Sequence, residues 1–196
     1  MAEYIKREGG KKYSIIYADP PWTFKTYSTK GAEKKSAQAH YDCMTLEDIK
    51  ALRVDAIADK DCVLFMWATY PMLSAALETI KAWGFEYKTI AFTWVKRNKK
   101  TDSWFMGCGF WTRSNAEICL LATRGHPRRV STSVRQIVDA PVMEHSRKPD
   151  EVRDRIVQLL GDVPRIELFA RQTATGWDCI GNEIDGTDIR DFLKEE

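Results

Sequence analysis

The stretch Asp19-Pro20-Pro21-Trp22 has the most specific chemistry in the sequence. Residues 13–18 predict a short buried strand, which must end there because neither proline can donate a backbone hydrogen bond to a neighbouring strand. Proline also restricts the residue before it, so the Asp19 carboxylate and the Pro20 carbonyl would be two fixed acceptors beside the Trp22 ring. Such a group suits the exocyclic amine of an aromatic base, whose lone pair it could direct toward an electrophile.

A plainer interpretation of the same residues is a turn that caps the strand, with Trp22 packed in the core. In an open α/β sheet, however, ligands bind outside the carboxyl ends of the strands, and Asp19 and Trp22 follow such an end. An acid, two prolines and an aromatic residue after an apolar strand are more specific than a generic turn.

The four residues resemble the catalytic signature of amino-methyltransferases that move a methyl group from S-adenosylmethionine to the exocyclic nitrogen of adenine. Over most of its length the chain is similar to the family typified by the eukaryotic mRNA adenosine-N6 methyltransferase catalytic subunit, which has small bacterial and phage members. Further landmarks in the same order are Trp94-Val95-Lys96, Asn115-Ala116-Glu117, Lys148-Pro149-Asp150-Glu151, Ile166-Glu167-Leu168-Phe169-Ala170-Arg171 and Gly181-Asn182-Glu183-Ile184-Asp185-Gly186.

The resemblance implies a set of site residues. It makes Asp19, Pro20, Pro21 and Trp22 catalytic, and it assigns S-adenosylmethionine to Asp19, Asn115, Glu117, Arg171, Gln172, Thr173, Asn182 and Glu183. Two departures stand out: Ala116 aligns with a cofactor-binding lysine of the eukaryotic subunit, and Thr173-Ala174 replaces its His-Asn pair. Contact with the carboxylate of the cofactor is therefore expected from another residue.

Basic residues are concentrated in the middle of the chain. Residues 93–135 contain nine lysines and arginines against two acids, although the whole chain has a net charge of only +2. A basic surface suits a polyanion, but a solvated basic face without a partner explains the same pattern. Two polar segments, 23–42 and 97–113, are expected to be substrate-side loops, and the residues expected to bind the substrate are Trp22, Tyr27, Lys96, Arg97, Lys99, Lys100 and Arg113.

The remaining pattern predicts the elements that position these residues. Further strands are expected at 63–67, 89–95, 117–122, 165–170 and 177–180, and helices after Thr45, from Leu73 to Gly84, from Pro149 to Gly161 and in the tail from Asp188. Residues 125–129 are expected to form a turn with cations, and residues 130–146 give no clear prediction. We expect one α/β domain over residues 1–196, with a mostly parallel central sheet flanked by helices. It would be of the Rossmann-like methyltransferase type with permuted motif order, because the catalytic strand precedes the cofactor-side strand.

Composition excludes several classes. Hydrophobic residues make up 44% and charged residues 30%, which is typical of a globular protein. No apolar run approaches the roughly 20 residues of a membrane span, and the N-terminus has no signal-peptide core, so a cytoplasmic protein is expected. The five cysteines form no C-x-x-C pair and the three histidines lie far apart, so no metal site is expected.

The function expected from the resemblance is methylation of the adenine N6 amine in DNA, with S-adenosylmethionine as methyl donor. The same reaction on RNA is an alternative, since nothing in the sequence reports on a 2′-hydroxyl. A catalytically inactive nucleic-acid-binding protein of the same fold is a second alternative. A homodimer or a related partner subunit also stays open.

Overall fold

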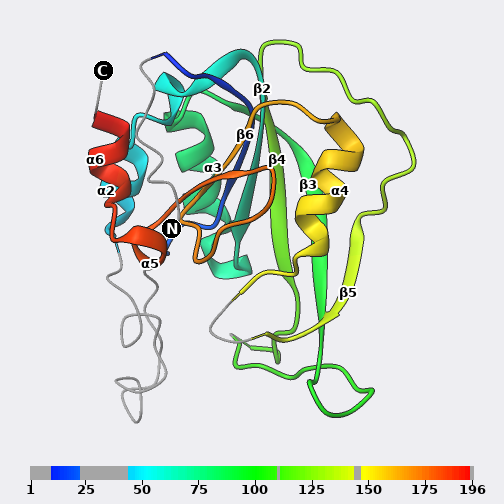
Figure 1. The fold of residues 1–196 in the computed structure, drawn as a ribbon. Helices are drawn as coiled ribbons and strands as arrows, with labels where there is room; N and C mark the ends of the chain where they lie inside the picture. Colours follow the sequence, from blue (N-terminus) through cyan, green and yellow to red (C-terminus); the bar gives the residue numbers. More distant parts are fainter. Residues whose placement is uncertain (1–9, 23–43, 110, 144–146, 195–196) are drawn as a thin grey trace.

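Seven strands form one sheet in the order β5-β3-β4-β2-β1-β6-β7 (Figure 1). The computed structural model describes residues 10–22, 44–109, 111–143 and 147–194. The strands are β1 (Tyr13–Ala18), β2 (Ala58–Ala68), β3 (Glu86–Arg97), β4 (Glu117–Arg124), β5 (Ile137–Pro141), β6 (Arg165–Leu168) and β7 (Asp178–Ile180). The helices are α2 (Leu46–Ala51), α3 (Leu73–Ala82), α4 (Glu151–Leu160), α5 (Asn182–Asp185) and α6 (Ile189–Lys194), with 3-10 turns at Val54–Ala56 and Tyr70–Met72.

Strand direction confirms the expected mostly parallel sheet. β1 is parallel to β2 and β6, β6 is parallel to β7, and β3 is parallel to β5. β4 is antiparallel to both of its neighbours, β2 and β3. The first residue of β4, Glu117, therefore lies at the edge where the other strands end, which we call the carboxyl edge. The last residues of β4 lie at the opposite edge, which we call the amino edge.

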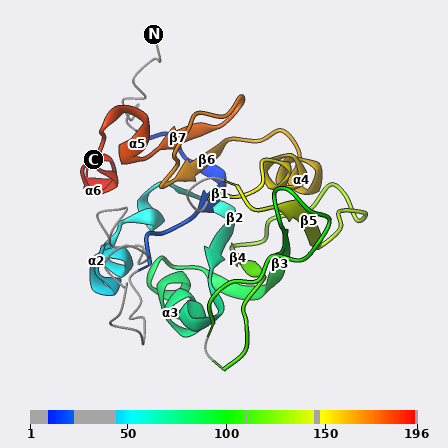
Figure 2. The ribbon, with the colours of Figure 1, turned by 90° about the horizontal axis from the view of Figure 1, so that it is seen from below.

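Helices cover both faces of the sheet, as expected for this fold class (Figure 2). α2, α3 and α6 pack on one face, around buried side chains such as Ile16 and Leu64, whereas α4 packs on the other, against Ile15 and Phe65. Both faces are hydrophobic because successive side chains of a strand point to opposite sides, and a sheet covered on both sides must bury both. Among the described residues, no helix is long and apolar enough to span a membrane.

The predicted helix ends agree with the capping chemistry of the sequence. The Thr45 hydroxyl accepts a hydrogen bond from the Asp48 backbone N–H at 3.1 Å and so caps α2. Gly84 and Gly161 follow α3 and α4 with φ angles of 79° and 86°, which glycine adopts at little cost. These local signals place the helices correctly along the sheet.

Several elements differ from the predictions: the short helix α5 was not predicted, and β2 begins five residues earlier than expected. Residues 130–146, which gave no clear prediction, contain the short edge strand β5, in which buried and exposed residues alternate up to Pro141. The strand predicted for 165–170 ends at Leu168, because Phe169 adopts a φ of 62° that no strand can contain. That residues 1–196 form one domain stays a prediction, and the whole of the loop 23–42 lies outside the described residues.

Candidate functional site

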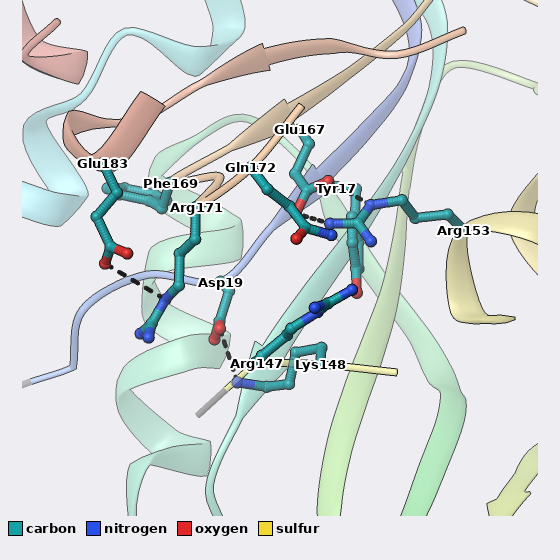
Figure 3. Close-up of a pocket in the computed structure, with 10 residues that line it drawn as sticks. All are labelled: Tyr17, Asp19, Arg147, Lys148, Arg153, Glu167, Phe169, Arg171, Gln172 and Glu183. Atoms are coloured by element: carbon teal, nitrogen blue, oxygen red, sulfur yellow. Dashed lines mark hydrogen bonds and ion pairs between the residues drawn. The ribbon is translucent and has the colours of Figure 1, made fainter. Parts of the chain in front are cut away.

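A pocket opens at the carboxyl edge, where β1 and β6 lie side by side (Figure 3). From β1 the chain continues to β2 on one side, and from β6 it continues to β7 on the other. This divergence is a topological switch point, where open α/β sheets bind their ligands. The lining residues are Tyr17, Asp19, Arg147, Lys148, Arg153, Glu167, Phe169, Arg171, Gln172 and Glu183.

Asp19 meets a lysine that lies far away in the sequence. The Lys148 ammonium donates to the Asp19 carboxylate at 2.6 Å and lies 3.3 Å from the Glu117 carboxylate. Pro149 and α4 directly after Lys148 fix its backbone, and its side chain is only 10% exposed. Burial would lower the pKa of Lys148, but the two carboxylates raise it above its usual value, so the ammonium stays charged.

A row of alternating charges extends from the pocket toward β3. Glu117 accepts from Lys148 on one side and from Lys96 on the other, where the Lys96 ammonium lies 2.5 Å from the carboxylate and 4.8 Å from the Trp94 ring centre. Burial alone would raise the pKa of Glu117, but the two ammonium groups outweigh it and lower the pKa. The row Asp19, Lys148, Glu117 and Lys96 therefore joins the ends of β1, β4 and β3.

A second ion pair forms the other wall of the pocket. Arg153 of α4 donates to both oxygens of the Glu167 carboxylate, at 2.6 and 2.8 Å, and to Asp150 at 2.7 Å. Burial raises the pKa of Glu167, although the guanidinium opposes this effect. Burial also raises the pKa of Tyr17, whose hydroxyl accepts from the Trp67 indole at 2.6 Å. These hydrogen bonds join α4 to β6 and β2 to β1 along this wall of the pocket.

The turns after β6 and β7 press against each other and shape the third wall. Phe169 lines the pocket and has a positive φ. Residues other than glycine rarely adopt this conformation, and those that do are concentrated at functional sites. A side chain at Gly181 would place its Cβ 2.0 Å from the Ala170 carbonyl oxygen, so only glycine fits there. This contact brings Glu183 within 3.7 Å of Arg171.

The structure gathers some of the expected cofactor residues and separates others. Asp19, Arg171, Gln172 and Glu183 line the pocket together, whereas exposed Thr173 and Asn182 are not among its lining residues. Glu117 reaches the pocket only through Lys148.

Asn115 is used within the chain rather than at the pocket. Its amide oxygen accepts from the Lys96 backbone N–H at 2.9 Å, and its amide nitrogen donates to the carbonyls of Lys96 and Phe105 at 2.9 and 2.5 Å. The amide therefore clamps the chain before β4 to the end of β3. These contacts occupy the amide N–H groups of Asn115 and one lone pair of its oxygen, so its assignment to the cofactor stays a prediction that would rest on the second lone pair.

The turn at residues 19–22, which is predicted to be catalytic, differs in part from its expected form. The Pro20 carbonyl accepts from the Trp22 backbone N–H at 2.8 Å, which tightens the turn and leaves one lone pair of the oxygen for another donor. The Trp22 ring is 7% exposed and donates through its indole N–H to the Trp67 carbonyl at 2.9 Å. Trp22 thus anchors the turn to the core, as in the plainer interpretation, and is not an open stacking surface. Pro21 lies between them in the turn.

The expected substrate residues fall into two groups. Lys96 and Arg97 are held in ion pairs, Lys96 with Glu117 and Arg97 with Asp139, so a role in phosphate binding would require these pairs to open. The side chains of Lys99, Lys100 and Arg113 are exposed in the β3–β4 connection. Tyr27 lies outside the described residues.

Sequence reasoning missed several residues that line the pocket, foremost Lys148, Arg153 and Glu167. Lys148 and Glu167 stood within recognised landmarks but had no role assigned, and a lysine directly before a helix-starting proline was the available signal for Lys148. Among the described residues, no three His, Cys, Asp or Glu side chains gather as a metal site would require.

Comparison with known proteins identifies relatives of this chain. The MT-A70 family model matches residues 13–183. The type II methyltransferase M.MunI of a Mycoplasma species is 36% identical over 190 residues, which cover 89% of this chain and 78% of that protein. The N(6)-adenosine-methyltransferase catalytic subunit METTL3 of Homo sapiens is 28% identical over 184 residues, covering 92% of this chain and 30% of METTL3.

An N(6)-adenosine-methyltransferase MT-A70-like protein of Drosophila melanogaster is 29% identical over 184 residues and has a similar coverage, 92% of this chain and 28% of the relative. The chain thus spans less than a third of these two animal proteins. The family match covers most of the chain, from β1 to α5, and includes every strand of the sheet. The chain therefore belongs to the MT-A70 family.

Proposed function

We propose that the protein transfers a methyl group from S-adenosylmethionine to the N6 amine of adenine in DNA. The observation that carries the proposal is the Asp19 carboxylate, which the double-proline turn holds at the switch point of the sheet, facing a pocket lined by charged groups. Membership of the MT-A70 family supports the reaction type. DNA is favoured because this chain covers 78% of a relative that is named a type II methyltransferase, whereas it covers less than a third of METTL3.

The pocket residues fit S-adenosylmethionine by their chemistry. That molecule has a carboxylate, an ammonium group and ribose hydroxyls, and the pocket offers the cations of Lys148 and Arg171 beside the carboxylates of Asp19, Glu167 and Glu183. Lys148 supplies the cation that Ala116 lacks, and Gln172 and Glu183 suit the ribose. When bound, the cofactor supplies an electrophilic methyl group on its sulfonium.

The residues of the chain act on the adenine amine by holding it. Asp19 accepts one N–H of the amine and the second lone pair of the Pro20 carbonyl accepts the other, which directs the nitrogen lone pair outward. The Lys148 ammonium leaves Asp19 for this purpose and keeps its contact with Glu117, 3.3 Å away. Alignment of this kind lowers a barrier by up to roughly 7–11 kcal/mol.

Proton transfer follows the methyl transfer and does not precede it. The amine becomes cationic as it gains the methyl group, and the adjacent Asp19 carboxylate stabilises that charge. The extra proton is then acidic enough to leave to solvent without a strong base. In a duplex the N6 amine is engaged in base pairing, so the adenine must be flipped out at a cost of a few kcal/mol or presented in a single strand.

RNA is the second candidate substrate, because the relatives METTL3 and the Drosophila protein are named adenosine-methyltransferases. The sheet, the turn and the pocket would serve either nucleic acid. A homodimer or a partner subunit, and a cytoplasmic location, remain predictions of the sequence.

The test is methyl transfer from labelled S-adenosylmethionine to matched DNA and RNA pools, followed by nucleoside mass spectrometry. We expect N6-methyladenine in DNA, and we expect Asp19→Asn to lower the rate about 10²–10³-fold, because the neutral amide no longer stabilises the cationic amine. Glu86→Gln, which removes an exposed carboxylate at the amino edge, is the matched control and should retain full activity. Product in RNA alone would reverse the choice of substrate, and equal activity of Asp19→Asn would refute the mechanism.

A further inference from the structure

An exposed tryptophan stands on a prepared support beside the end of β3. Trp104 is 56% exposed in the turn that follows β3, and one face of its indole ring lies against the Arg97 guanidinium, 3.9 Å from carbon Cζ to the ring centre. Arg97 and Trp104 also form an antiparallel backbone bridge. The ring therefore has one face backed by a cation and much of its surface open to solvent.

Each nitrogen of the supporting Arg97 guanidinium donates a hydrogen bond to a carboxylate. Its Nε and Nη2 donate to the two oxygens of Asp139 at 2.8 Å each, and its Nη1 donates to Asp102 at 2.8 Å. Two carboxylates thus neutralise the charge of Arg97, and a phosphate would have to compete with them for the guanidinium. Its place under the indole ring instead makes it a positioning residue for Trp104.

The backbone around Trp104 is fixed as well. The Phe105 N–H donates to the Lys96 carbonyl at 2.9 Å, and the Phe105 carbonyl accepts from Asn115 at 2.5 Å. Asn98 donates to the Ser103 hydroxyl at 2.8 Å and to the Trp104 carbonyl at 3.2 Å. An exposed aromatic ring held this firmly loses little conformational entropy when a flat partner stacks on it.

The position and charge of this surface select the partner. It lies at the carboxyl edge, where β3 is three strand spacings from β1, or about 14 Å. The exposed cations Lys99 and Lys100 lie in the same turn, so an anionic chain that reaches Asp19 can meet both cations and the ring. A symmetric contact with a second copy would set these cations against their own counterparts, which disfavours that partner.

We propose that Trp104, backed by Arg97, is a stacking platform for an unpaired base near the target adenine in the nucleic-acid substrate. The inference rests on the proposed function, because it deepens the description of the same substrate. It assigns Lys99 and Lys100 to the phosphates, and it assigns the discrimination between stacked and unstacked neighbours to Trp104.

The test measures binding of a fluorescent single-stranded oligodeoxynucleotide with one adenine, alongside copies in which one neighbouring base is replaced by an abasic site. Trp104→Ala should weaken binding about tenfold, in the range found for loss of one base–aromatic stack, and Trp104→Phe should restore part of it. At one neighbouring position the abasic copy should bind the parent about tenfold more weakly but bind Trp104→Ala without further loss. Tyr87→Ala, an exposed aromatic at the other end of β3, is the control.

Salt dependence separates stacking from charge. Trp104→Ala should leave the slope of log affinity against log salt unchanged, whereas Lys99→Ala with Lys100→Ala should reduce it by about 1.4. The double variant Arg128→Ala with Arg129→Ala removes two cations beyond the far end of β4 and is the matched control. It should change neither the affinity nor the salt slope. Asp139→Asn should give a weaker form of the Trp104→Ala defect, since it loosens Arg97.

Two outcomes overturn the platform. One is binding of Trp104→Ala within twofold of the parent with the same abasic profile, and the other is conversion of a dimer to a monomer by Trp104→Ala without nucleic acid. Binding needs no turnover, so the platform can hold even where the methyl-transfer assay fails. Conversely, if Trp104→Ala transfers methyl groups normally and keeps the abasic profile of the parent, the platform is refuted and the proposed function stands.

Discussion

The carboxyl edge and the amino edge of the sheet differ in the contacts that their residues make. At the carboxyl edge, partly buried charges face one another at short range, as in the row from Asp19 to Lys96. At the amino edge, the chain turns by close backbone contact, as at Gly125, where φ is 65° and a Cβ would lie 2.2 Å from the Lys60 carbonyl oxygen. The first arrangement costs desolvation and suits ligand binding, whereas the second only closes the fold. Substitutions should therefore separate activity from stability according to the edge.

The largest effect should come from replacing Lys148, the lysine that lines the pocket. Lys148→Met keeps the length of the side chain but leaves Asp19 and Glu117 without the ammonium between them, and the carboxylate of the cofactor without its partner. We expect kcat/KM to fall about 10²-fold or more, and cofactor binding measured by calorimetry to weaken. Lys148→Arg should retain part of both, and Lys60→Met at the amino edge should retain all. If kcat/KM of Lys148→Met were within threefold of the parent value, the proposed difference between the two edges would be refuted.

The amino edge should respond in stability alone. Gly125→Ala forces a methyl group into the Lys60 carbonyl and the Asp61 carboxylate at a positive φ, so the free energy of unfolding should fall by about 2–3 kcal/mol. Urea denaturation measures this loss, and methyl transfer per folded molecule should be unchanged. Gly84→Ala has a similar φ of 79° but open space around the new methyl group, so its cost should be only about 1 kcal/mol. Equal costs at the two glycines would show that the contact with Lys60 is relieved by a small shift.

A smaller and pH-dependent effect should arise at Glu117. Its pKa is lowered in the folded protein, so its ionisation stabilises the fold above the unfolded value of about 4.3, and this contribution is lost as the pH falls through the folded pKa. The difference in unfolding free energy between the parent and Glu117→Gln should be largest above about pH 5 and shrink toward pH 3. Urea titrations at stepped pH measure it. A difference that stays constant over this range would contradict the ion-pair account of the carboxyl edge.

Local signals in the sequence were enough to place most elements. The prolines after Asp19 ended β1 at the correct residue, and Thr45, Gly84 and Gly161 marked helix ends through side-chain capping and positive φ. The strand β5 escaped because a five-residue edge strand that ends in proline has little hydrophobic pattern. Such signals depend only on neighbours in the sequence, which is why they could be recognised.

The chemistry of the site was less predictable, because it depends on contacts across the sheet. Lys148 lies 129 residues from Asp19, so no spacing rule could pair them. The Trp22 indole N–H and the Asn115 amide nitrogen donate to backbone carbonyls within the chain, which their residue types alone do not show. The basic stretch 93–135 was also predicted as one surface, yet β4 runs through it from one edge to the other. Its cations before and after β4 therefore lie at opposite ends of the sheet (Figure 1).

The central position of β1 also has a consequence for synthesis of the protein. β1 pairs on one side with β2, which begins about 40 residues later, but on the other side with β6, which begins only at Arg165. At 5–20 residues per second, about 10–30 s pass on the ribosome before β6 can cover that edge. During this interval an apolar strand edge is open to pairing with other chains. The Asp19 turn is thus translated about 150 residues before β6, and its pocket can close only after β6 and the residues that follow it have been made.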